Sequence, residues 1–158
     1  MADLQSTECI IVGGGPAGLS AATALAKAGL RCVVLEEHPT IGLPVACAEG
    51  ISIEKLKYFD IPTDLITLTN KTALVERRVA LQRFFFGTTG VAISRIDTAI
   101  LDRARFEQFL AKRAKDAGAQ ILTSTTVTNM RVSDTHVTVD AKTAQGKSLS
   151  FIAPVAIG

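Results

Sequence analysis

The sequence has 158 residues, of which 47% are hydrophobic, and its 17 Lys and Arg against 15 Asp and Glu give a formal net charge of +2. This composition is typical of a globular protein and excludes a disordered or fibrous one. A chain of this length buries roughly 70% of its unfolded surface, enough for one sizeable core. The small, dispersed positive charge gives no indication of nucleic-acid binding.

The polar start of the chain lacks the pattern of a signal peptide, and no apolar run approaches the roughly 18 to 20 residues of a membrane span. We therefore expect a soluble cytoplasmic protein, with peripheral contact to a membrane surface left open. The three cysteines, Cys9, Cys32 and Cys47, form no CxxC pair. This spacing argues against a disulfide framework and a zinc site, so we predict no metal site and expect Cys9 and Cys32 in the core.

The first third of the chain alternates a strand, a glycine turn, a helix and a second strand. Residues 8–12 are apolar after Glu8, residues 13–18 contain four glycines, residues 19–28 are rich in Ala and Leu, and residues 31–35 are apolar after Arg31. Both predicted strands are apolar at successive positions, as expected for a parallel sheet covered on both faces. Gly29 is placed to end the helix.

The rest of the chain is predicted to add a long loop, a hairpin, a helix and a meander. Turn residues and apolar periodicity indicate a short helix over 53–58, strands over 73–86 and 91–96, a helix that Asp102 caps and Gly118 ends, a strand over 119–122, meander strands over 125–131, 136–142 and 148–152, and a last strand over 155–157. The sequence stops on that last strand, so we expect a truncated part of a longer protein. The expected fold class is α/β, a Rossmann-like nucleotide-binding fold with a parallel sheet and an inserted three-stranded antiparallel meander.

The glycine turn carries the clearest chemical signal. Gly13, Gly15 and Gly18 form GxGxxG between a strand and a helix, and Glu36 ends the next strand. In this pattern the glycines allow a tight turn, close approach of a pyrophosphate and close helix packing, while the acidic residue accepts hydrogen bonds from a ribose. We predict that Gly13, Gly15, Pro16, Ala17, Gly18 and Glu36 bind a dinucleotide. Glu37 is the competing acidic candidate, with a solvated side chain as its alternative.

The longer form GGGPAGLSAA over residues 13–22 resembles the FAD-dependent oxidoreductases of the glutathione-reductase-like superfamily, in the branch that includes aromatic hydroxylases. The resemblance implies FAD as the cofactor, with NADPH or a small electron carrier as the electron donor. It also implies that the backbone of Val127, where the chain enters the meander, lies beside the adenine.

Residues 41–52, IGLPVACAEGIS, resemble the signature of the geranylgeranyl reductase family, although Ala48 stands where that family usually has Gly. Residues 101–107, LDRARFE, resemble the same family's D-R-x-x-F-D helix. The resemblance implies that Ala46 and Cys47 lie beside the flavin, with Cys47 as the candidate catalytic residue, and that Arg103 contacts FAD. The alternatives are a small buried Cys47 and a solvated Arg103.

The family implies a flavoprotein that reduces carbon–carbon double bonds of isoprenoid groups by hydride transfer from reduced flavin. The alternatives are a flavin-dependent aromatic monooxygenase and a non-catalytic nucleotide-binding module. We expect residues 1–158 to be the N-terminal portion of the FAD-binding domain and to be inactive alone. Residues 60–97 are expected to enter a β-hairpin that resembles part of a substrate domain. The expected substrate is a small molecule or a prenyl lipid. We expect Phe84–Phe86 to pack in the core, with an isoprenoid tunnel as the alternative. His38 and His136 have no acidic or Cys partners at metal-ligand spacing and are interpreted as surface residues.

Overall fold

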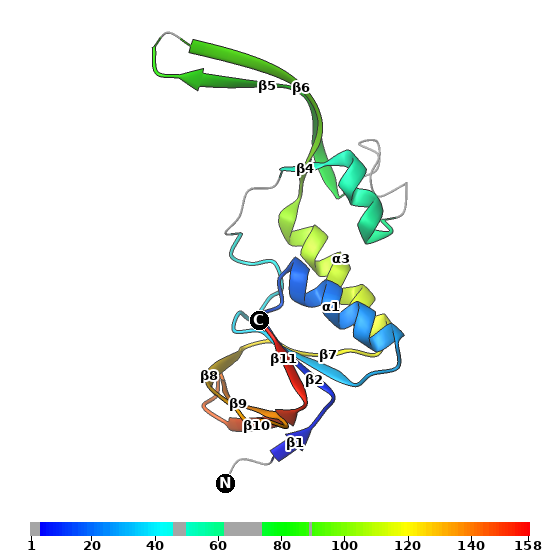
Figure 1. Cartoon of the computed structure of the whole chain (residues 1–158), viewed down its shortest axis with the longest axis vertical. Helices are drawn as coiled ribbons and strands as arrows, with labels where there is room; N and C mark the ends of the chain where they lie inside the picture. The colour runs from blue at the N-terminus through cyan, green and yellow to red at the C-terminus, as the bar shows by residue number, and fades with distance from the viewer. Residues whose placement is uncertain (1–3, 46–49, 62–73, 89) are drawn as a thin grey trace. The chain divides into compact units, whose positions relative to one another are not determined.

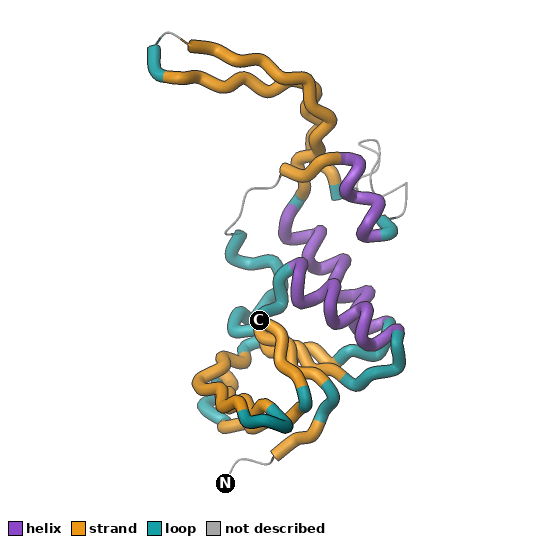
Figure 2. Tube along the Cα trace, in the orientation of Figure 1, coloured by secondary structure: helices purple, strands orange, loops and turns teal. Residues whose placement is uncertain are grey.

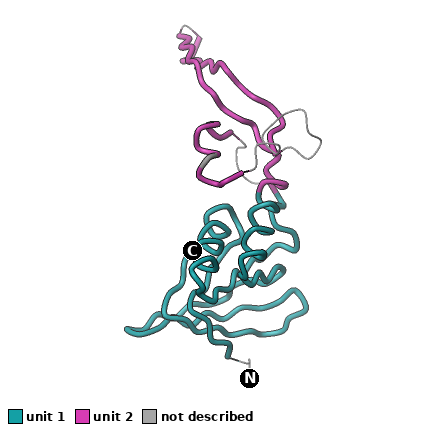
Figure 3. The backbone as a smooth tube through the Cα atoms, turned by 90° about the vertical axis from the view of Figure 1, so that its right-hand side faces the viewer, with its two compact units in different colours: residues 1–44, 107–158 teal, residues 45–106 magenta. Residues whose placement is uncertain are grey.

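Successive apolar residues build a four-stranded parallel sheet in the computed structural model, which describes residues 4–45, 50–61, 74–88 and 90–158. Each neighbouring pair in this sheet runs parallel. Figure 1 shows the strands, which in sheet order are β11 (Val155–Ile157), β2 (Cys9–Val12), β3 (Cys32–Leu35) and β7 (Gln120–Leu122). The sheet belongs to the first of two compact units, which comprises residues 1–44 and 107–158, whereas residues 45–106 form the second (Figure 3).

One face of the parallel sheet packs against helices. Side chains alternate between the faces of a strand, so every second residue of β2 and β3 points to the same side. Helix α1 (Pro16–Lys27) and the part of helix α3 (Arg103–Asp116) that lies in the first unit cover this face. The buried cluster between them consists of Cys9, Ile11, Ala22, Cys32, Val34, Ala114 and Ala119. Both cysteines are buried, as predicted, and burial raises the pKa of each thiol.

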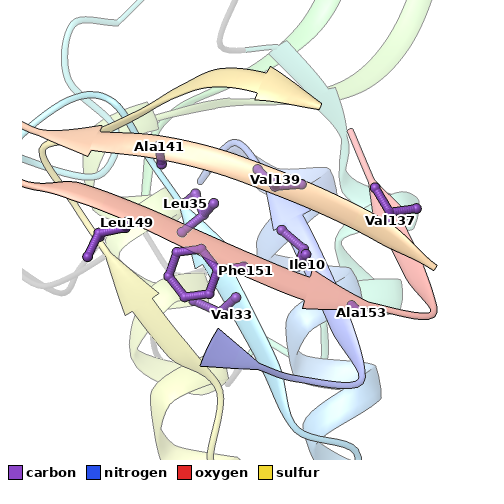
Figure 4. Close-up of a cluster of buried hydrophobic side chains, with 9 residues drawn as sticks. All are labelled: Ile10, Val33, Leu35, Val137, Val139, Ala141, Leu149, Phe151 and Ala153. Atoms are coloured by element: carbon purple, nitrogen blue, oxygen red, sulfur yellow. The ribbon is translucent and has the colours of Figure 1, made fainter. Parts of the chain in front are cut away.

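The opposite face of the parallel sheet packs against an antiparallel meander. Its strands are β8 (Thr125–Val132), β9 (Val137–Thr143) and β10 (Ser148–Ala153), and β1 (Leu4–Ser6) adds a parallel strand beside β10. Figure 4 shows the buried cluster between the two sheets, which consists of Ile10, Val33, Leu35, Val137, Val139, Ala141, Leu149, Phe151 and Ala153. The apolar runs of β2 and β3 are therefore explained by burial on both faces.

The second unit contains an antiparallel sheet in the order β4 (Gly50–Ser52), β6 (Gly90–Leu101) and β5 (Val75–Phe86), together with the 3₁₀ helix η1 (Ile53–Phe59). Strands β5 and β6 form a long hairpin (Figure 2). The core packing expected for Phe84–Phe86 is wrong, because these side chains are 43%, 71% and 65% exposed. Apolar side chains become buried only where another surface covers them, and no described part of the chain packs over these three.

The predicted fold class is confirmed: a parallel sheet, two covering helices and a three-stranded meander form an α/β fold. The predicted cap of α3 is also present, since the backbone N–H of Arg105 donates to Oδ1 of Asp102 at 3.0 Å. The sequence analysis missed the short strands β1 and β4, and β6 extends to Leu101 instead of ending at Ile96. Among the described residues, no helix is both long and apolar enough to cross a membrane.

Phe151→Ala is expected to lower the free energy of unfolding by about 3–5 kcal/mol, because this ring is only 1% exposed and its removal leaves a cavity between two sheets. Phe85→Ala deletes the same atoms from a ring that is 71% exposed, and should change the free energy of unfolding by less than about 0.5 kcal/mol. Urea denaturation of both variants measures the contrast. Equal losses would contradict the assignment of the core.

Candidate nucleotide-binding site

The glycine turn between β2 and α1 presents backbone N–H groups at the carboxyl end of the parallel sheet. Gly13 adopts a left-handed φ of +103°, which glycine tolerates without strain, and its N–H donates to the Leu35 carbonyl at 2.9 Å. Gly15 is the N-cap of α1 and Pro16 occupies the first turn. No side chain caps this end of the helix, and no acidic residue lies in its first turn. The end is therefore suited to an anion.

Two glycines of the turn have opposite surroundings. A Cβ at Gly18 would overlap the carbonyl oxygen of Gly13 and lie 3.1 Å from Cγ2 of Ile11, so α1 packs directly on the turn. A Cβ at Gly15 would meet no atom within 4 Å, which leaves open space in front of the helix. The contacts at Gly18 are those of a close-packing glycine, whereas the approach of a phosphate to the open space at Gly15 stays a prediction.

Glu36, directly after β3, faces the turn and is held by three hydrogen bonds. Its Oε2 accepts from the Gly14 N–H at 2.6 Å, and its Oε1 accepts from the backbone N–H of His38 at 2.8 Å and lies 2.7 Å from Nδ1 of the same residue. The side chain is only 12% exposed. Partial burial acts to raise the pKa of the Glu36 carboxyl, but the hydrogen bonds from His38 and Gly14 outweigh it and lower the pKa below its ordinary value.

A cavity of about 210 Å³ opens beside Glu36. Its walls come from the end of β2, the end of β3 and the start of β8, and they comprise Val12, Gly13, Leu35, Glu36, Glu37 and residues 125–127. Backbone hydrogen bonds fix these walls to one another, because the Thr125 N–H donates to the Glu36 carbonyl at 2.8 Å and the Glu36 N–H donates to the Leu122 carbonyl at 2.9 Å.

The structure brings several predicted site residues together. Gly13, Glu36, Glu37 and Val127 line the same cavity. Gly15, Pro16, Ala17 and Gly18 lie at the start of α1. Arg103 is the first residue of α3 and belongs to the second unit, so its contact with a cofactor stays a prediction. The predictions for Ala46 and Cys47 lie outside the described residues.

The sequence analysis missed Thr125 and Thr126, which enter the cavity only because β8 begins beside the end of β3. It also did not anticipate the contacts of the His38 ring with two carboxylates: Nδ1 lies 2.7 Å from Glu36 and Nε2 lies 4.0 Å from Glu37. Metal-ligand spacing does not indicate these contacts. The position of His38 two residues after Glu36 is the sequence feature that could have predicted the contact with Glu36.

Glu36→Gln is expected to lower the free energy of unfolding at pH 7 by about 1–3 kcal/mol, because the charged acceptor of three hydrogen bonds is lost. The folded-state pKa of Glu36 is lowered, so its stabilisation is fully present above the unfolded value of about 4.3 and disappears as the pH falls through the folded value. The difference between variant and unaltered chain should therefore shrink below about pH 5. Urea denaturation at a series of pH values measures it.

Glu37→Gln is the matched control, since it removes the same charge one residue away from a side chain that is 62% exposed. Its free energy of unfolding should stay within about 0.5 kcal/mol of the unaltered chain. A Glu36→Gln difference that stays constant between pH 7 and pH 3 would contradict the role assigned to the carboxylate.

Comparison with known proteins shows relatives over most of the chain. It is 34% identical over 130 residues to an uncharacterized protein of Methanosarcina barkeri, which covers 79% of this chain and 69% of that protein. It is also 34% identical over 125 residues to the digeranylgeranylglycerophospholipid reductase of Thermoplasma volcanium, which covers 75% of this chain and 30% of the reductase. The chain thus spans about a third of the length of the reductases that it matches.

A solved structure shares the fold. The geranylgeranyl bacteriochlorophyll reductase-like protein of Thermoplasma acidophilum superposes with a TM-score of 0.82 at 24% identity, over 98% of this chain and 39% of that protein. The family model described as the FAD binding domain matches residues 6–158. The open glycine turn, the ionised Glu36 and the adjoining cavity fit the ADP half of that cofactor. This chain therefore belongs to the FAD-binding domain family of flavin-dependent oxidoreductases, and its distant homologues include digeranylgeranylglycerophospholipid reductases.

Proposed function

We propose that this chain binds FAD beside Glu36 and serves in the reduction of carbon–carbon double bonds of geranylgeranyl groups. The observation that carries the proposal is the pairing of the glycine turn with the partly buried, ionised Glu36 carboxylate, in a chain homologous to proteins named digeranylgeranylglycerophospholipid reductases. NADPH or a small electron carrier as the electron donor is part of the same proposal.

Each part of the site has a separate task in holding the ADP half of FAD. The N-terminus of α1 and the space in front of Gly15 receive the pyrophosphate, because the first N–H groups of a helix have no partners within it. The Glu36 carboxylate accepts hydrogen bonds from ribose hydroxyls. The cavity bounded by Leu35 and residues 125–127 surrounds the adenosine.

Bound FAD supplies two-electron chemistry, in which its reduced form gives a hydride to one alkene carbon while a proton reaches the other. The contribution of the described residues is to bind and orient the nucleotide half of the cofactor. Placement of Cys47 beside the flavin remains a prediction from the family resemblance.

A cavity in the second unit supports an apolar substrate. It has a volume of about 550 Å³ and lies on the β4–β6–β5 sheet, where Val79, Leu81, Ile96 and Ile100 line it with Ser52 and Thr98. None of its described lining residues is charged. A mostly apolar, charge-free wall of this kind suits a hydrocarbon chain better than a charged ligand.

Titration with FAD is expected to show saturable binding, followed by flavin fluorescence, with weaker binding of NAD. Gly15→Val should abolish FAD binding, because its side chain fills the space in front of α1. Ala24→Val is the control, since it enlarges an exposed residue of the same helix away from the N-terminus. Circular dichroism shows whether each variant is folded.

Preference for NAD over FAD would contradict the proposed cofactor. Retained FAD binding in folded Gly15→Val would contradict the proposed position of the pyrophosphate. Loss of binding in both valine variants would indicate a general effect on α1 instead of a specific one at the turn.

Geranylgeraniol is expected to bind the chain more tightly than p-nitrophenol, measured for both by equilibrium dialysis. Val79→Asp should weaken the binding of geranylgeraniol at least about tenfold, because it places a charge in the apolar cavity. Phe85→Asp introduces the same charge on the same sheet at an exposed side chain outside the cavity lining, and should leave this affinity within about twofold. Tighter binding of the phenol would favour an aromatic hydroxylase and contradict the prenyl substrate.

A further inference from the structure

His38 contacts the Glu36 carboxylate through both its backbone and its ring. Its backbone N–H donates to Oε1 of Glu36 at 2.8 Å, and Nδ1 of its ring lies 2.7 Å from the same oxygen. His38 is not among the described residues that line the cavity, whereas Glu36 is. The imidazole therefore contacts the carboxylate without occupying the space for the ligand.

The ionisation of Glu36 fixes the direction of this hydrogen bond. The pKa of Glu36 is lowered, so near neutral pH its carboxylate can only accept hydrogen bonds. Nδ1 of His38 must then carry the proton and donate it to Oε1. The other ring nitrogen, Nε2, lies 4.0 Å from Oε1 of Glu37, the only other charged group recorded beside the ring among the described residues.

The acceptor positions of Glu36 are divided between the protein and the cavity. A carboxylate has about four such positions. His38 takes two on Oε1 and the Gly14 N–H takes one on Oε2, which leaves about one position for a ligand hydroxyl. Bonds on both oxygens also prevent the carboxylate from rotating.

The imidazole is itself held on a fixed backbone. The carbonyl of His38 accepts a hydrogen bond from the Ser124 N–H at 3.0 Å, and the carbonyl of Glu36 accepts one from the Thr125 N–H at 2.8 Å. Residues 36–38 are thus tied to the segment that enters β8. A donor on this backbone can define the orientation of the carboxylate before a ligand arrives.

We propose that His38 is a positioning residue, whose Nδ1–H holds Oε1 of Glu36 so that the carboxylate accepts a hydroxyl of the adenosine ribose. The inference rests on the proposed FAD-binding function and assigns His38 a task in it. It explains why a half-exposed histidine lies against a nearly buried glutamate at the edge of the cavity.

The test compares ADP with 2′,3′-dideoxy-ADP, each displacing FAD from the unaltered chain and from His38→Ala. The variant should bind ADP about three- to tenfold more weakly, the size expected for one lost hydrogen bond. Its affinity for dideoxy-ADP, which has no ribose hydroxyls, should be unchanged. A loss of affinity that occurs with ADP and not with dideoxy-ADP shows that the His38 side chain acts through the ribose hydroxyls.

His38→Asn is the conservative variant, because its amide nitrogen stands near the place of Nδ1 and keeps a donor for Glu36. It should bind ADP within about twofold of the unaltered chain. His136→Ala removes the second histidine, which contacts Ser133 and Thr135 in an exposed turn, and should leave both affinities unchanged.

Equal weakening of ADP and dideoxy-ADP by His38→Ala would overturn the positioning role, as would an asparagine variant as weak as the alanine variant. Either result leaves FAD binding by the unaltered chain intact, so the proposed function survives. Failure of the unaltered chain to bind FAD would instead overturn the proposed function and this inference with it.

Discussion

The close contact between the start of α1 and the glycine turn is the constraint on which the site depends. Because residue 18 has no side chain, the backbone of the helix lies directly against the carbonyl of Gly13. The helix can therefore begin close to the end of β2, which places its N-terminus at the carboxyl end of the parallel sheet. A side chain at this position would push the helix away and with it the amide groups that receive a phosphate.

Glu36 joins three elements that are distant in the sequence. Its side chain binds the glycine turn, its carbonyl accepts from the start of β8, and its own N–H bonds the end of β7. The same residue therefore connects the walls of the cavity and, in the proposed function, accepts a hydrogen bond from the ligand. Hydrogen bonds from His38 and Gly14 favour the ionised form of this carboxylate, so we expect stability in acid to depend on it, and the proposed ribose contact uses the same group.

Most elements of the fold could be predicted because their signals are local. The apolar runs of β2 and β3, the glycines that end the helices and the alternation of β9 depend on neighbouring residues. Strand β1 could not be found this way, since its residues are exposed and it is defined by pairing with β10. Apolar sequence also predicted burial of Phe84–Phe86, but burial requires a partner surface that no local pattern specifies.

The site was predictable to the extent that it follows a motif. The spacing of Gly13, Gly15, Gly18 and Glu36 identified the turn and the acidic residue, and the structure places Val127 in the same cavity. Thr125 and Thr126 carry no motif, because their location follows from the topology of β7 and β8. The contact of His38 depends on the direction of two side chains after the end of a strand, which periodicity does not define.

The exposed hairpin of the second unit also has a consequence for behaviour in solution. Strand β5 is at the edge of its sheet, and Leu81, Phe85, Val91 and Ile93 are each more than half exposed on the hairpin. Such an edge favours self-association. Strands β5 and β6 carry four arginines, Arg77, Arg78, Arg83 and Arg95, against the two acidic residues Glu76 and Asp97, and Arg78 is paired with Asp97 at 2.8 Å. Charged side chains on an edge strand generally oppose edge-to-edge pairing, and salt weakens this effect because it screens the charges.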